Sequence, residues 1–378
     1  WSFLSRKRKK EINFLFVIVL INSFTELISL ISIIPFLAIL VNPSDIYDIS
    51  FVKGFANLLN ISSAGQLLFA LTAIFLAGTL VSGIMRLAFY FLTYRVAGNI
   101  GSELSNNAFK NSLYKSYKYH LNTNSNILIT TLSKDINEII YMIFVPVIQL
   151  ISSLIISTVI IFSLFFINFY ISFSSLIIIT ILYFLFFRSS SGTIAKFSKR
   201  NLIISQSLTK LVQESLGAIR EIKISNNYNF YIRKHLRDEK YFRREVGNGT
   251  FILTLPRLIV EPAGIILLAF LGYMLTITGE SRQVIPIIGT FSFSGLKLLP
   301  YVQKMYEGIN YPRLAKSRLI NLLNILEKEP TKEAYQSRSI KIKLQQKLSL
   351  VNLGFSYEKE TSPILKKLNL TINLGDKI

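Results

Sequence analysis

The chain contains no cysteine and only two histidines. Disulfide frameworks and catalytic thiols are therefore excluded, and so are the usual zinc sites, which combine Cys and His ligands. Acidic residues are also scarce, since 21 Asp and Glu stand against 42 Lys and Arg, for a formal net charge of +21. No basic stripe is interleaved with aromatic residues, so we do not expect nucleic acid as a partner. Because cysteine is absent and histidine is scarce, we do not expect a metal site either.

Apolar residues dominate what is present. The chain is 51% hydrophobic and 17% charged, which is more apolar than ordinary soluble domains. This balance predicts a membrane protein whose basic residues collect on cytoplasmic flanks. The basic run RKRKK at 6–10 precedes an apolar run that is too long for a signal peptide and lacks a small-residue cleavage site, so we expect it to remain as a span.

Stretches of about 20 apolar residues, the length that crosses a bilayer, predict a mostly α membrane protein with six transmembrane helices. No charged residue lies between Glu138 and Arg188, a stretch long enough for two crossings joined by a turn near Asn168. The six expected spans are residues 12–41, 67–97, 139–165, 169–187, 250–278 and 284–306.

Lys and Arg gather in the segments before residue 11, at 95–134 and at 188–244, whereas the opposite loops carry few. Both termini are therefore expected in the cytoplasm, as in an integral protein of the inner (cytoplasmic) membrane. Residues 98–138 and 188–248 are polar with helical apolar spacing, which predicts long cytoplasmic helical extensions of the spans. Paired extensions of about 20 residues would project roughly 30 Å.

The outer loop between the first two spans contains a short apolar pattern with helical spacing, formed by Phe51, Phe55, Leu58 and Leu59. One interpretation is a helix in the outer membrane interface that touches lipid or a lipid-tailed substrate. The other is a loop helix that packs on the bundle.

A soluble region follows the spans. Residues 1–327 are expected to form the transmembrane domain and 328–346 a linker. Residues 347–378 then alternate as strands, with Leu368, Leu370, Ile372 and Leu374 on one side and turn residues Gly375 and Asp376 at the end. Because an isolated hairpin is marginal in water, we expect this segment to open a larger domain with its core beyond Ile378.

With these features, the chain resembles the ATP-binding cassette exporters of the half-transporter kind. The tail GFSY followed by PILKKLNLTINLGDKI is similar to the start of their nucleotide-binding domain, and the glycine-rich phosphate loop would come directly after it. The runs TELISLISIIPFLAIL, ESLGAIREIK, LPRLIVEPAGI and GLKLLPYVQKMYEGINY resemble the subgroup that flips lipid-linked oligosaccharides and related polysaccharide precursors.

The resemblance implies ATP and Mg²⁺ as cofactors, bound mainly by residues beyond 378, with Tyr357 stacking on adenine; the chain to 378 would then lack the ATPase motifs. It also implies a homodimer in membrane lipid that transports a lipid-linked glycan by alternating access. Coupling turns that dock on the nucleotide domains are expected near 120–127 and 214–222. Their candidate residues are His120, Asn124, Glu214, Arg220 and Glu221.

Charged residues inside spans point to a substrate cavity, because each costs about 3 kcal/mol unless it faces protein or water. Arg86, Arg257 and Lys297 would line it and bind a pyrophosphate-linked lipid. Alternatively, Arg86 pairs with Glu26, Arg257 pairs with Glu261 at i, i+4, and Lys297 extends towards an interface.

Other functions fit parts of this pattern. Within the exporter class, lipid, peptide or drug export would use the same architecture with a different cavity. Outside it, a secondary transporter or channel would explain six spans but neither the long inner extensions nor the strand-rich tail.

Overall fold

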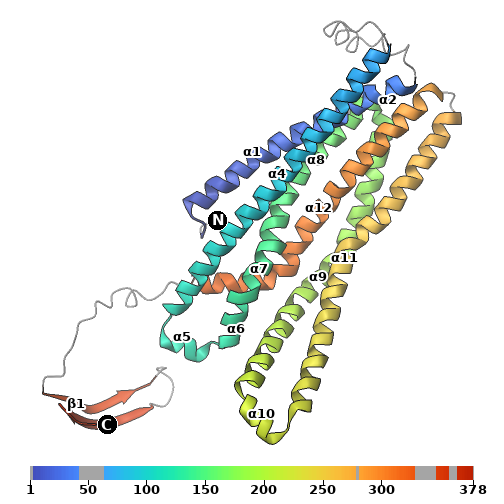
Figure 1. The fold of residues 1–378 in the computed structure, drawn as a ribbon. Coiled ribbons are helices and arrows are strands. Elements are labelled where there is room, and N and C mark those ends of the chain that lie inside the picture. Colours follow the sequence, from blue (N-terminus) through green and yellow to red (C-terminus); the bar gives the residue numbers. More distant parts are fainter. Residues whose placement is uncertain (1–2, 42–63, 278–280, 328–345, 357–363, 378) are drawn as a thin grey trace.

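The computed structural model describes residues 3–41, 64–277, 281–327, 346–356 and 364–377. Within them, long helices are followed by a two-stranded sheet (Figure 1). The elements are α1 (Arg6–Ile31), α2 (Ile33–Val41), α4 (Ala64–Leu113), α5 (Tyr117–Asn122), α6 (Ser125–Thr130), η2 (Thr131–Asp135), α7 (Ile136–Ile139), η3 (Ile140–Phe144), α8 (Val145–Ile167), α9 (Phe169–Gly217), α10 (Ile219–Ser225), α11 (Tyr228–Ile277), α12 (Ser281–Glu327), β1 (Lys347–Phe355) and β2 (Leu365–Asn373).

Local sequence explains where several helices begin and end. Asn168 closes α8 and caps α9, with its side chain accepting a hydrogen bond from the Ile171 amide at 3.1 Å. The predicted turn near Asn168 is therefore confirmed. The first predicted span is interrupted at Ser32, between α1 and α2. Pro35 accounts for the break, because a proline ring clashes with the carbonyl four residues earlier, here that of Ile31.

Five of the described helical stretches are long and apolar enough to cross a membrane. They are Arg6–Leu37, Gly65–Leu113, Ser125–Ile167, Phe169–Ser190 and Tyr228–Met274. The chain is therefore an integral membrane protein. Helix α12 contains the expected sixth span, residues 284–306, but is not among the five, so the count of six stays a prediction.

Two pairs of helices continue far beyond bilayer thickness. Helix α9 has 49 residues and α11 has 50. At 1.5 Å per residue each is roughly 75 Å long, about 45 Å more than the hydrocarbon core. Helix α4 and the stretch from α6 to α8 form the other pair, and α5 and α10 lie at the tips of the two pairs (Figure 1). The predicted helical extensions are confirmed.

Helix α12 holds the bundle together, because it contributes to three hydrophobic clusters along its length. Leu298 packs with residues of α1, α8 and α9, Leu314 with α9 and α11, and Leu322 with α1, α4 and α8. Gly308 permits the closest approach: a Cβ there would lie 2.8 Å from the Pro146 carbonyl oxygen of α8. Small residues allow such close backbone packing between membrane helices.

The strands β1 and β2 pair antiparallel, with Leu348 opposite Ile372 and Leu350 opposite Leu370. The expected turn chemistry is present: Gly375 has φ +96°, and the Asp376 carboxylate accepts a hydrogen bond from the Asn373 amide at 2.7 Å. Most side chains of this hairpin are exposed. The division into transmembrane domain, linker and nucleotide-binding domain stays a prediction.

Candidate functional site

A buried carboxylate joins three helices. Glu26 of α1 is 0% exposed and accepts hydrogen bonds from two cations, Arg86 of α4 and Lys297 of α12. The Arg86 Nε lies 3.1 Å from Glu26 Oε1, and the Lys297 Nζ lies 2.7 Å from Oε2. The Arg86 Nη2 also donates to Glu26 Oε1.

Helical spacing adds polar neighbours to this cluster. Tyr301 follows Lys297 by one turn of α12, and its hydroxyl donates to Glu26 Oε1 at 2.9 Å. Ser29 follows Glu26 by one turn of α1 and accepts from Lys297 Nζ at 2.9 Å. The Arg86 guanidinium also lies over the Tyr301 ring, 5.6 Å from its centroid. We call Glu26, Ser29, Arg86, Lys297 and Tyr301 the α1–α4–α12 cluster.

The α1–α4–α12 cluster carries excess positive charge. A charge inside a span is costly unless it is paired or faces water, and here two cations share one carboxylate. The Lys297 side chain is 11% exposed, whereas that of Arg86 is 40% exposed. The surplus charge therefore reaches the surface of the helix bundle at Arg86.

The structure brings together two of the three predicted cavity residues. Arg257 of α11 lies apart from Arg86 and Lys297, with its Nε 3.7 Å from the Glu261 carboxylate and both side chains about half exposed. The alternative interpretation, in which Arg86 pairs with Glu26 and Arg257 pairs with Glu261, therefore agrees with the contacts. The alternative in which Lys297 extends towards an interface is wrong, because its ammonium is buried against Glu26 and Ser29.

Sequence reasoning missed Tyr301 and Ser29, although each lies one helical turn from a residue that it did identify. It also missed a second buried ion cluster, in the helical extensions. Arg318 of α12 is 4% exposed and contacts Asp135 at 3.2 Å and Glu138 at 3.0 Å. These residues are unremarkable in a polar segment, so no local signal distinguishes them.

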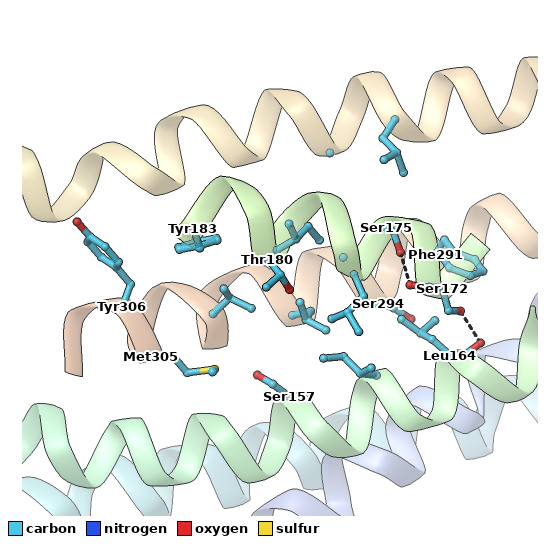
Figure 2. A pocket seen from close by; sticks show the side chains of 18 of the residues that line it. Ser157, Leu164, Ser172, Ser175, Thr180, Tyr183, Phe291, Ser294, Met305 and Tyr306 are labelled. Atoms are coloured by element: carbon cyan, nitrogen blue, oxygen red, sulfur yellow. Dashed lines mark hydrogen bonds between the residues drawn. The ribbon is translucent and has the colours of Figure 1, made fainter. Parts of the chain in front are cut away.

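A cavity of about 470 Å³ lies between α8, α9, α11 and α12. Figure 2 shows Ser157 of α8, Thr180 and Tyr183 of α9, and Ser294 and Met305 of α12 around it. None of Arg86, Arg257 and Lys297 lines this cavity. Within the described residues, the charged α1–α4–α12 cluster and this apolar cavity are therefore separate features.

A family comparison agrees with this architecture. Residues 12–281, more than half of the chain, match the model of the ABC transporter transmembrane region. The chain belongs to this family. None of the curated proteins matches the chain.

As an ABC transporter transmembrane region, the chain has a general role in transport across a membrane. The residues expected at its coupling turns lie at or next to the tips. His120 is in α5, and Asn124 caps α6 by accepting from the Asn126 amide at 3.1 Å. Arg220 and Glu221 are exposed on α10, whereas Glu214 belongs to the last turn of α9 and pairs with Lys210 at 3.6 Å.

Other expected site residues of this ABC transporter region lie outside the described residues. These are Tyr357, expected at adenine, and the interfacial set Phe51, Phe55, Leu58 and Leu59. Within the described ranges, no group of three or more His, Asp or Glu side chains is placed to hold a metal ion. ATP and Mg²⁺ as cofactors stay predictions.

Proposed function

We propose that the chain is the membrane half of an ATP-driven exporter that flips a lipid-linked oligosaccharide or polysaccharide precursor. The observation that carries the proposal is the surplus positive charge of the α1–α4–α12 cluster, in which one carboxylate balances two cations. A cargo with an anionic group between its lipid and its glycan complements that charge.

A lipid diphosphate fits this cluster chemically. Arginine binds phosphate oxygens through two parallel N–H groups, and the interaction strengthens away from bulk water. Arg86 is the exposed member, so an anion would meet its guanidinium first. Lys297 behind it would add charge at short range, since both cations contact the same Glu26 carboxylate. Arg257, half exposed on α11, would be a further contact.

The long helical arms support an exporter. Helical extensions of about 45 Å beyond the hydrocarbon core would let nucleotide-binding domains move the membrane spans from a distance. The exposed tip residues Arg220 and Glu221 of α10 and His120 of α5 would dock on those domains. In this arrangement both termini are cytoplasmic and six spans per chain pair with those of a second copy.

The hairpin of β1 and β2 supports a nucleotide-binding domain that continues beyond it. Leu348, Val351 and Phe355 of β1 and Leu370 of β2 are all substantially exposed. Such apolar side chains need a partner layer, because a two-stranded sheet is marginal alone. In the proposal, ATP and Mg²⁺ bind mainly to residues that follow 378, and Tyr357 stacks on adenine.

Export of an uncharged lipid or drug is the second candidate. The apolar cavity between α8, α9, α11 and α12 favours it, since none of its lining residues is charged. Peptide export would use the same architecture, but no feature of the described residues favours it. A secondary transporter or channel would not explain the helical extensions of about 45 Å.

Arg86→Gln tests the proposal in the full-length protein, reconstituted in proteoliposomes with a polyprenyl-diphosphate glycan. The variant leaves Glu26 paired one-to-one with Lys297, so folding should be retained. We expect transport to fall about tenfold or more, as when a charged hydrogen bond is lost, with basal ATPase activity little changed. Arg237→Gln, on the exposed part of α11, is the matched control. Equal loss of transport and ATPase activity would refute substrate contact.

A further inference from the structure

Three tyrosines extend from Arg86 along the surface of the helix bundle. Tyr90 and Tyr94 follow Arg86 at intervals of four residues on α4, so the three side chains share one side of that helix. The rings of Tyr90 and Tyr94 are stacked, with centroids 6.5 Å apart and planes at 23°. The Tyr94 ring in turn lies 6.4 Å from the ring of Tyr141, which belongs to η3. We call Tyr90, Tyr94 and Tyr141 the tyrosine track.

The tyrosine track is accessible from outside the chain. Tyr94 is 47% exposed and Tyr141 is 53% exposed, whereas Tyr90 is half-buried. Aromatic residues that serve the core lose this exposure, as the neighbouring Phe89 does at 3%. The contacts among the three rings therefore leave large parts of Tyr94 and Tyr141 open to a ligand.

The tyrosine track lies on a different side of α4 from its apolar surface. That surface is formed by four residues that are 63–72% exposed: Leu80, Ile84, Leu87 and Phe91. An exposed apolar stripe on a membrane span is the side that suits contact with lipid. Leu87 lies about 100° around the helix from Arg86, so the track and the lipid-facing stripe are distinct.

Helix α12 places a charged pair beside the tyrosine track. The Lys304 ammonium donates to the Glu307 carboxylate at 2.9 Å, and the two side chains are 35% and 19% exposed. Both groups interact electrostatically with the Tyr90 side chain, and Lys304 also interacts with Tyr94. Because charged groups at membrane depth face protein or water, this side of the bundle borders polar space.

Sugars match this combination of groups. One face of a sugar ring consists of C–H groups, which the negative face of an aromatic ring attracts, and its edge carries hydroxyls. An ammonium donates to such hydroxyls and a carboxylate accepts from them. A hydrocarbon would make no use of the Lys304–Glu307 pair, and a phosphate would be repelled by Glu307.

We propose that the tyrosine track stacks on the sugars nearest the diphosphate of the cargo, with Lys304 and Glu307 binding their hydroxyls. The inference rests on the proposed function, in which Arg86 meets the diphosphate. Tyr90 and Tyr94 are about 6 and 12 Å from Arg86 along the axis of α4. In the proposed topology this direction leads to the cytoplasm, where the glycan extends before transport.

The test measures binding by the purified full-length protein of two ligands in detergent. One is a short-chain polyprenyl diphosphate that carries a tetrasaccharide, and the other is the same lipid diphosphate without sugar. We expect Tyr94→Leu and Tyr141→Leu each to raise the Kd of the glycan ligand about threefold to tenfold, because a stacking contact is lost, and to leave the Kd of the sugar-free ligand unchanged. Tyr94→Phe and Tyr141→Phe keep the rings and should bind both ligands like the original protein.

Two control variants separate the tyrosine track from its surroundings. Phe91→Leu removes an exposed ring from the lipid-facing stripe of α4 and should change neither Kd. Arg86→Gln should raise the Kd of both ligands, because both carry the diphosphate.

The outcomes distinguish this inference from the proposed function. Equal weakening of both ligands by the Tyr→Leu variants would mean that the rings pack against protein, including a second copy, and would overturn the track. Unchanged binding of both ligands would also overturn it, while an effect of Arg86→Gln would keep the diphosphate contact. A glycan-specific loss without an effect of Arg86→Gln would support the track and refute contact at Arg86. Failure of the original protein to bind either ligand would refute the proposed function and the track together.

Discussion

The Lys297 ammonium of α12 donates a hydrogen bond of 2.7 Å to the Glu26 carboxylate of α1. Because Arg86 of α4 donates to the same carboxylate, one buried acid connects the start of the bundle to its last long helix. Such a carboxylate has two consequences. It compensates the positive charges of Lys297 and Arg86, and it links α1, α4 and α12 through one side chain.

Replacement of Glu26 by Gln should destabilise the protein by about 3–5 kcal/mol, because Arg86 and Lys297 would remain without a counterion. The measurement is the apparent melting temperature in detergent. Glu261→Gln is the matched control: its partner Arg257 is half exposed at 3.7 Å, so we expect a change within about 1 kcal/mol. Equal effects of the two variants would contradict a compensating role for Glu26.

Removal of the ammonium together with the carboxylate should cost less than the two single changes added. In a double-mutant cycle of Glu26→Gln and Lys297→Met, we expect a coupling free energy of about 1–3 kcal/mol, since the atoms are in direct contact. The same melting experiment measures it. Additive effects would mean that the two groups do not stabilise each other in the membrane.

Arg318→Met should also be strongly destabilising. It would leave Asp135, which is fully buried, next to Glu138 without their shared cation, at a cost of about 3–5 kcal/mol. Arg237→Met removes an arginine that is 76% exposed and should change stability by less than about 1 kcal/mol. Comparable melting temperatures for the two variants would exclude a structural role for the Arg318 cluster.

Gly308→Ala should loosen the contact of α12 with α8. The new Cβ would lie 2.8 Å from the Pro146 carbonyl oxygen and 2.6 Å from Leu150 Cβ, so the helices must separate. Overpacking of this kind costs about 1–3 kcal/mol. Gly295→Ala, on the same helix in open space, controls for the change in helix propensity. A lower melting temperature for Gly295→Ala than for Gly308→Ala would contradict the packing.

The absence of cysteine allows the topology to be tested without background labelling. Glu221→Cys at the tip of α10 should react with a membrane-impermeant maleimide in inside-out vesicles. Tyr170→Cys, next to the α8–α9 turn, should react in right-side-out vesicles instead; Tyr170 is 84% exposed. This pattern follows from the excess of Lys and Arg in the helical extensions. The reverse pattern would place the termini outside.

Local patterns predicted the helices well. The uncharged stretch between Glu138 and Arg188 is too long for one crossing and predicted two crossings with a turn near Asn168; the turn lies there. The amphipathic spacing within residues 188–248 likewise predicted a helical extension, and α9 continues as a helix to Gly217. These features depend on neighbours within a few turns, which a sequence shows directly.

Local sequence patterns predicted the contacts of the α1–α4–α12 cluster less well. Glu26, Arg86 and Lys297 were each identified as charges in apolar surroundings, and pairing of Arg86 with Glu26 was one expectation. That Lys297 turns to the same carboxylate depends on the rotation of α12 and on its position beside α1. Tyr301, the Arg318 cluster and the apolar cavity depend on the same packing.

The sequence by itself thus determined a membrane protein with long apolar helices, basic flanks and helical extensions, because length, hydrophobicity and charge are local properties. Only the tertiary structure decided which charges meet and which tyrosines lie beside them. A helix presents a different face with each 100° of rotation, so Leu298 lines the cavity while its neighbour Lys297 binds Glu26.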